Sequence, residues 1–167
     1  MPYPELIFYT TVLIGSIAML LHLRRGAFFV PSRRNDVSRM LSFLNVRHGM
    51  RIADLGSGDG RLLIAIAEAG GEAHGYEHNP LLVWQSRWAI KKRGLQNRAF
   101  VHYSDFWKED FSSYDAVVLY GIPYIMSKLE AKLRRELRPG TRVVSNAFTF
   151  PTWEPIEKVH RVYLYQI

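Results

Sequence analysis

The chain has 167 residues, which is enough for one globular domain with a hydrophobic core of its own. It contains no cysteine, so disulfides, thiolate metal ligands and a cysteine nucleophile are excluded. Lysine and arginine outnumber the acidic residues by seven, but they are spread along the chain, which favours a basic surface near a membrane over a nucleic-acid site. The six histidines show no ligand spacing, so we expect no metal site.

The N-terminal segment, residues 1–25, is expected to be a membrane anchor. Residues 6–23 carry no charge, and Arg24 and Arg25 follow directly. As a helix this run would be about 27 Å long, close to the hydrocarbon thickness of a bilayer. Positive charge after the apolar run is the reverse of a signal peptide and predicts a single transmembrane helix with its N-terminus outside. A buried or interfacial helix is the alternative.

Residues 26–48 are expected to form a linker and a helix at the edge of the domain. Asn35 or Asp36 is a suitable N-cap for this helix. Four apolar residues at helical spacing would then share one face: Val37, Met40, Leu41 and Leu44. We expect this face to pack on the domain edge, and a lid over a cofactor is the alternative.

A glycine-rich loop separates the next two expected elements. Residues 51–55 are typical of a short buried strand and residues 61–69 of an amphipathic helix, with Gly56, Gly58 and Gly60 between them. Glycine tolerates positive φ and has no Cβ, so such a loop lets backbone N–H groups approach a nucleotide-type cofactor closely. An ordinary tight connection between a strand and a helix is the alternative.

The residues around this loop favour S-adenosylmethionine over a dinucleotide. The spacing is G-x-G-x-G, whereas dinucleotide folds use G-x-G-x-x-G, and Arg61 stands where the third dinucleotide glycine would fall. Asp54 and Asp59 would repel a pyrophosphate, but they would attract the ammonium and sulfonium groups of S-adenosylmethionine.

A second strand is predicted over residues 72–77, and it ends in an acid. Glu77 lies 21 residues after Gly56, near the offset of about 20 residues at which Rossmann-like folds bind ribose hydroxyls. Asn79 then caps the following helix and Pro80 opens it. We therefore expect Glu77 to accept hydrogen bonds from a ribose, and a solvated carboxylate at a strand end is the alternative.

Strands and helices continue to alternate along the remaining chain. The pattern predicts strands over 99–105, 114–120 and 141–148, a helix over 123–137 and a short antiparallel hairpin over 156–167. Such alternation predicts an α/β, doubly wound, Rossmann-like parallel sheet. In the predicted helix, Glu130 and Arg134 are expected to form an exposed ion pair one turn apart.

Two further strand ends are candidate site positions, because ligands bind beyond the carboxyl ends of the strands in such sheets. Asp105 is expected to accept a hydrogen bond from the adenine amino group, with Phe106 or Trp107 against the ring, and a loop cap is the alternative. Tyr120 begins the YGIP stretch at 120–123, at the end of the other strand, and a packing aromatic is its alternative.

Several stretches together resemble class I S-adenosylmethionine-dependent methyltransferases, and within them a membrane-anchored lysine methyltransferase family. That family includes the mitochondrial enzymes that methylate the c-subunit of ATP synthase and the adenine nucleotide translocase, with relatives in prokaryotes. The resemblance covers most of residues 52–155. It rests on DLGSGDGR at 54–61, GYEHNPLLVWQSR at 75–87, SDFWK at 104–108, YGIP at 120–123, KLEAKLRREL at 128–137 and FPTWEP at 150–155.

The resemblance implies roles for the residues that match. Eight residues would bind the cofactor: Asp54, Gly56, Ser57, Gly58, Gly60, Glu77, Asp105 and Phe106. Within this set, the aspartate at 54 and the loop at 56–60 would hold the methionine end, Glu77 the ribose and Asp105 the adenine. Tyr120 and Pro123 would be the catalytic residues, because they would border the channel where a lysine meets the methyl group. The shortened C-terminal hairpin departs from the family pattern at the substrate-binding rim.

The predicted function is methyl transfer from S-adenosylmethionine to the ε-amine of a protein lysine. A membrane-embedded protein is the expected substrate, and residues 49–167 the catalytic domain. Because no arginine-rich transit peptide precedes the apolar run, the cytoplasmic side of a prokaryotic plasma membrane is expected, or the mitochondrial inner membrane in a eukaryote. A lipid or small-amine methyltransferase and an RNA methyltransferase are alternatives. A non-catalytic membrane-tethered binding module is a further one.

Overall fold

The computed structural model describes residues 4–25 and 33–167, without the side chains of 17–25 and 34. The chain forms two compact units, divided between Val30 and Pro31.

The first unit contains helix α1, Pro4–Arg25. Its large apolar side chains between Leu6 and Ile14 are more than half exposed. The same helix contains three hydroxyl side chains, which donate hydrogen bonds to carbonyls of the preceding turn: Thr10, Thr11 and Ser16. In the part of the chain that the structure describes, no helix is both long and apolar enough to cross a membrane. The expected helix is present, but the predicted transmembrane anchor is not supported.

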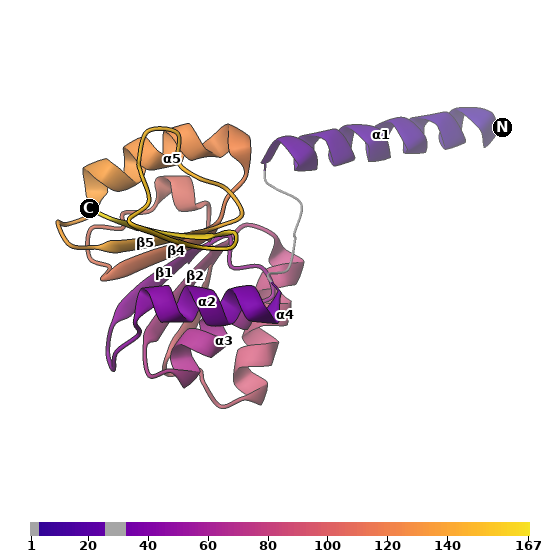
Figure 1. Ribbon diagram of the computed structural model, residues 1–167. Coiled ribbons are helices and arrows are strands. Elements are labelled where there is room, and N and C mark those ends of the chain that lie inside the picture. The colour runs from indigo at the N-terminus through magenta and orange to yellow at the C-terminus, as the bar shows by residue number, and fades with distance from the viewer. Residues whose placement is uncertain (1–3, 26–32) are drawn as a thin grey trace. The chain divides into compact units, whose positions relative to one another are not determined.

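The second unit is built on a seven-stranded sheet in the order β3-β2-β1-β4-β5-β7-β6 (Figure 1). The strands are β1 Arg51–Leu55, β2 Glu72–Glu77, β3 Ala99–Tyr103, β4 Ala116–Tyr120, β5 Arg142–Asn146, β6 Glu157–Val159 and β7 Val162–Gln166. The first five pair in parallel, and β7 runs antiparallel to both of its neighbours. This arrangement confirms the predicted α/β, doubly wound sheet with a C-terminal antiparallel hairpin.

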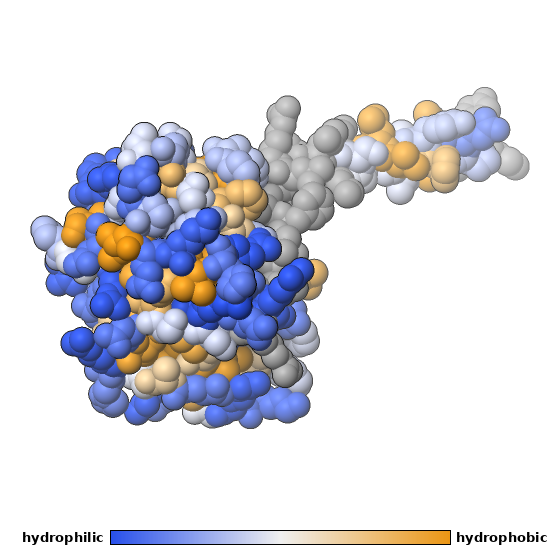
Figure 2. All heavy atoms as spheres, in the orientation of Figure 1, coloured by the Kyte–Doolittle hydropathy of each residue, from blue (hydrophilic) through white to orange (hydrophobic). Residues whose placement is uncertain are grey.

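Helices cover both faces of this sheet (Figure 1). They are α2 Arg34–Leu44, α3 Arg61–Glu68, α4 Pro80–Lys92 and α5 Pro123–Glu136, with a short 3-10 helix, η1, over Phe106–Lys108. The first three share a core with Ile52, Val118 and Val144, whereas α5 packs with Leu119 and Tyr165 on the opposite face. Figure 2 shows that the visible surface of this unit is mostly hydrophilic, with apolar groups in separate patches.

The start of α4 agrees with the sequence-based prediction, and the start of α2 differs from it. Asn79 accepts a hydrogen bond from the amide of Leu81, and Pro80 opens α4 as expected. Helix α2, in contrast, begins before Asp36, and its N-cap Arg33 makes no side-chain cap bond. The Asp36 carboxylate is instead buried and lies 3.0 Å from the guanidinium of Arg39.

Glu130 on α5 corrects a sequence-based expectation. Helical spacing predicts an exposed ion pair with Arg134, and the pair does form at 3.1 Å, but Glu130 is buried. Its carboxylate also accepts hydrogen bonds from the amide of Thr152, at 3.1 Å, and from its hydroxyl, at 2.6 Å. Glu130 therefore fixes the segment after β5 onto α5, a contact that helical spacing alone does not reveal.

Gly75 at the centre of β2 leaves room for the glycine-rich loop. A Cβ at this position would collide with Ser57 and would lie 2.5 Å from Cδ1 of Leu63. Because overpacking strains a close-packed core, we expect Gly75→Ala to lower the free energy of unfolding by about 1 to 3 kcal/mol in urea titrations. Adding Ser57→Gly should restore part of the loss, and an unchanged loss in the double variant would contradict this explanation.

Candidate active site

The candidate residues gather at one edge of the sheet. Strands β3, β2, β1 and β4 are neighbours and parallel, so their carboxyl ends lie side by side. The chain order reverses between β1 and β4, which is the position where doubly wound sheets bind ligands. Asp54, Glu77, Asp105 and Tyr120 are at, or just beyond, these four ends, as the sequence predicts.

The loop after β1 adopts the backbone conformation for which glycine is suited. Its three glycines have positive φ: 80° at Gly56, 56° at Gly58 and 78° at Gly60. The amides of Gly56 and Ser57 donate to the carbonyl of Tyr76, at 2.9 and 3.3 Å, which ties the loop to β2. A Cβ at Gly56 would meet nothing within 4 Å, so this side of the loop is open to a ligand.

Glu77 joins the loop to the start of α4. It ends β2, is buried, and accepts hydrogen bonds from the amide of Gly58 at 3.0 Å and from the amide of Asn79 at 2.8 Å. Each carboxylate oxygen takes one of these bonds, and the oxygen bonded to Asn79 also lies 3.5 Å from Nδ1 of His78. A buried, oriented carboxylate of this kind can accept hydrogen bonds from the hydroxyls of a ribose.

Asp54 is a second buried carboxylate at the same edge. Burial raises its pKa from 3.8 to about 8, and the negative charges of Glu77 and Asp59 act in the same direction. A cation bound beside Asp54 would favour its ionised form and so lower this pKa. The pair of acids thus suits a cationic ligand and disfavours a pyrophosphate.

Asp105 is the N-cap of η1, and Phe106 is its first residue. A carboxylate oxygen of Asp105 accepts a hydrogen bond from the amide of Trp107 at 3.1 Å, so the alternative cap role of this residue is observed. Phe106 is half-buried, with its ring centroid 4.9 Å from that of Trp107. The adenine contacts of Asp105 and Phe106 stay predictions.

Tyr120 and Pro123 lie between β4 and α5. Tyr120 is half-buried, and Pro123 is the exposed first residue of α5. The hydroxyl of Tyr120 accepts a hydrogen bond from Arg161 at 3.0 Å, and the guanidinium carbon lies 5.8 Å from the centroid of the tyrosine ring. Sequence reasoning missed Arg161, because it comes from the β6–β7 turn and no local pattern relates it to Tyr120.

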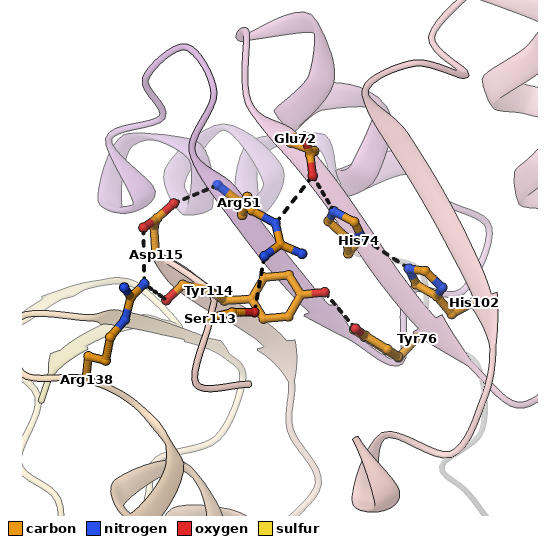
Figure 3. A network of polar contacts seen from close by, with 9 residues as sticks. All are labelled: Arg51, Glu72, His74, Tyr76, His102, Ser113, Tyr114, Asp115 and Arg138. Carbon is orange, nitrogen blue, oxygen red and sulfur yellow. Dashed lines mark hydrogen bonds and ion pairs between the residues drawn. The ribbon is translucent and has the colours of Figure 1, made fainter. Parts of the chain in front are cut away.

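A separate polar network accounts for two of the histidines (Figure 3). The carboxylate of Glu72 lies between Arg51, at 3.4 Å, and His74, at 2.7 Å, and a ring nitrogen of His74 lies 3.1 Å from one of His102. His74 lowers the pKa of Glu72 by its hydrogen bond. The network links three neighbouring strands of the sheet, and the described residues contain no group of His, Asp or Glu that could hold a metal.

Comparison with known families decides the assignment. The family model of the ANTKMT methyltransferase domain matches residues 54–157, which include the glycine loop, Glu77, Asp105 and Tyr120. The chain belongs to the ANTKMT methyltransferase family. The resemblance inferred from the sequence motifs is therefore confirmed.

Similar proteins include enzymes named as lysine methyltransferases. The chain is 45% identical over 127 residues to the ATP synthase c-subunit lysine N-methyltransferase of Rattus norvegicus, covering 76% of this chain and 58% of that protein. It is 34% identical to a protein-lysine N-methyltransferase of Saccharolobus islandicus (strain REY15A), covering 83% of this chain and 92% of that one. The chain spans somewhat more than half the length of the rat enzyme and 54% of the length of the human one.

A solved structure supports the fold. An RNA methyltransferase from Salinibacter ruber, in complex with S-adenosyl-L-homocysteine, is 34% identical and has a TM-score of 0.80, covering 83% of this chain and 94% of that one. This chain thus shares its architecture with an enzyme that is named for a nucleic-acid substrate, so the fold alone does not identify the acceptor.

Proposed function

We propose that this protein transfers a methyl group from S-adenosylmethionine to the ε-amine of a protein lysine. The cofactor assignment rests on two buried carboxylates, Asp54 and Glu77, next to an open glycine loop. The lysine acceptor rests on the names of the relatives, which include lysine methyltransferases for the ATP synthase c-subunit, for adenine nucleotide translocase and for an unspecified protein.

The proposed cofactor contacts divide by chemistry. Asp54 would face the positively charged methionine end together with amides of the loop at 56–60, and Glu77 would bind the ribose. Asp105 and Phe106 would hold the adenine. S-adenosylmethionine, when bound, supplies a methyl group on a positively charged sulfur, which makes that group open to displacement by an amine.

The acceptor lysine must be neutral to react, although its pKa in water is about 10.4. Tyr120 and Pro123 would border its channel, with the guanidinium of Arg161 next to the tyrosine. Removing the lysine from water and placing it near this positive charge both lower its pKa. Tyr120 would orient the amine, and alignment would supply much of the acceleration.

Removal of the Tyr120 hydroxyl tests this role. Tyr120→Phe is expected to lower the turnover number about tenfold, because the acceptor loses an orienting contact, while the cofactor dissociation constant changes by less than about twofold. Single-turnover methylation and calorimetric titration measure the two quantities. Tyr124→Phe, on an exposed residue of α5, is the matched control. Equal turnover of Tyr120→Phe and wild type would contradict the role.

We also propose that the enzyme works at the cytoplasmic face of a prokaryotic plasma membrane, on a membrane-embedded protein. The support is the uncharged run at 6–23 with arginines directly after it, and the exposed apolar side chains of α1 between Leu6 and Ile14.

Transfer of a labelled methyl group distinguishes the acceptors. The 167-residue chain in detergent is incubated with tritiated S-adenosylmethionine and membranes of the source organism, and the protein, lipid and RNA fractions are separated. Label on lysine in one protein, absent with Asp54→Asn, is the expected result. Label in lipid or in RNA would show that the lysine assignment is wrong. RNA is the alternative that the likeness to the Salinibacter ruber RNA methyltransferase favours. No enzyme-dependent label in any fraction would contradict the proposed activity.

A further inference from the structure

Helix α4 presents an apolar, aromatic surface to solvent. Three of its large side chains are largely exposed: Leu81 at 75%, Trp84 at 70% and Trp88 at 56%. Together with Gln85 they line a shallow hollow of about 340 Å³. We call these four residues the outer face of α4. On the other side of the helix, Val83, Ser86 and Ile90 are buried, so the outer face is not required to hold the helix on the sheet.

The charges next to this face are positive. Lys91 and Lys92 occupy the last turn of α4, and the Lys92 ammonium lies 5.3 Å from the centroid of the Trp88 ring. The helix contains no acidic residue. Arg87 has a structural role instead, because its guanidinium donates two hydrogen bonds to the carbonyl of Val101, at 2.7 and 3.2 Å. The outer face thus combines exposed tryptophans with two lysines at one end.

This combination is typical of helices that lie in the interface of a bilayer. Tryptophan favours the boundary between headgroups and acyl chains, where its ring is buried and its N–H stays hydrated. Lysine extends its apolar stem along such a surface and places its ammonium among anionic headgroups, at about 1 kcal/mol for each residue. Two large apolar rings exposed on the same helix face are unusual in a water-soluble domain and mark an interaction surface.

We propose that the outer face of α4 docks on the surface of an anionic lipid bilayer. The face begins at Leu81, and the N-cap Asn79 of the same helix is bonded to Glu77. Docking through α4 would therefore hold the candidate cofactor site next to the membrane surface. The proposal concerns lipid contact and does not depend on which acceptor the enzyme methylates.

The lack of cysteine in the 167-residue chain allows a local test by labelling a single introduced thiol. Gln85→Cys places a thiol in the outer face for an environment-sensitive fluorophore, and Ala131→Cys, exposed on α5 across the sheet, is the control. With phosphatidylcholine vesicles containing phosphatidylglycerol, the emission of the label at 85 should shift to the blue and rise about threefold, whereas the label at 131 should not change. The readout is local because α1 could also attach the chain to vesicles.

Substitution of the face completes the test. Trp84→Gln with Trp88→Gln should abolish the emission change at 85, and Lys91→Glu with Lys92→Glu should weaken it and remove its salt dependence. Cofactor affinity should stay unchanged in both variants, because these side chains are outside the cofactor site. Thermal unfolding should stay unchanged in the tryptophan variant, whose rings are exposed, and the lysine variant should unfold at a slightly lower temperature, because it loses the positive charges at the C-terminal end of α4.

Three results would overturn the proposal. The first is no emission change at 85 while the protein sediments with vesicles. The second is an equal change at 131. The third is a blue-shifted emission at 85 before vesicles are added, which would mean that protein, from the same or another copy, already covers the face.

Discussion

Glutamine in place of Glu77 is expected to weaken the binding of S-adenosylmethionine about 100-fold. The carboxylate would bind ribose hydroxyls, and two charge-assisted hydrogen bonds that become neutral cost about 3 kcal/mol. The same substitution weakens the bonds to the amides of Gly58 and Asn79, which position the loop. Isothermal titration calorimetry of the purified protein measures the loss.

The control for this change lies on the same strand. Glu72→Gln removes a carboxylate at the opposite end of β2, where Glu72 contacts His74 and Arg51 outside the candidate site. Cofactor affinity should change by less than about twofold in this variant. An affinity of Glu77→Gln equal to that of wild type would show that the ribose assignment is wrong.

Asparagine in place of Asp54 is expected to stabilise the ligand-free protein and to weaken cofactor binding strongly. The pKa of Asp54 is raised from 3.8 to about 8, so between these values the folded protein holds a proton that the unfolded chain releases. The free energy of unfolding of the wild type therefore falls as the pH rises through this range. A neutral side chain avoids the loss, and Asp54→Asn should gain about 4 kcal/mol at a pH of about 7 and almost nothing near a pH of about 4.

Although Asp54→Asn should stabilise the ligand-free protein, it should weaken cofactor binding. Asp54→Asn removes the charge that would face the methionine end, and we expect the dissociation constant to rise at least about 100-fold. In the wild type, affinity should fall about tenfold for each pH unit below about 8, because the cationic ligand must displace a proton from Asp54. Calorimetry in buffers of different ionisation enthalpy measures that proton release.

Asp59→Asn is the control for the Asp54 substitution. Asp59 also flanks the loop, but it is partly exposed and lies 2.6 Å from the guanidinium of Arg61. We expect a much smaller effect on affinity and on its pH dependence. If the affinity of Asp54→Asn for S-adenosylmethionine varied with pH as that of the wild type does, the assignment of Asp54 to the methionine end would be wrong.

The parts of the fold that depend on local signals were predictable from the sequence. Asn79 and Pro80 mark the start of α4, the positive φ angles of the loop require glycine, and the acid of β2 falls at the expected strand end. These features follow from backbone chemistry within a few residues. The alternation of strands and helices then predicts the parallel, doubly wound sheet, although not the order of its strands.

Contacts between distant segments were not predictable in this way. Glu130 has the spacing of a surface ion pair, but it is buried by the segment that contains Thr152, 22 residues later. Arg161 reaches Tyr120 only because β7 inserts between β5 and β6. Hydropathy likewise predicted a membrane-crossing helix at the N-terminus, which the described residues do not support.

The bridge from Gly58 through Glu77 to Asn79 also bears on how quickly a ligand is captured. Because these backbone and side-chain groups are already ordered in the ligand-free protein, the entropy of ordering them is lost during folding and not during association. Encounter should then lead directly to the bound state, with an observed association rate that rises linearly with ligand concentration and reaches no plateau from a preceding rearrangement. Differences in affinity among variants of this bridge should appear mainly as differences in residence time.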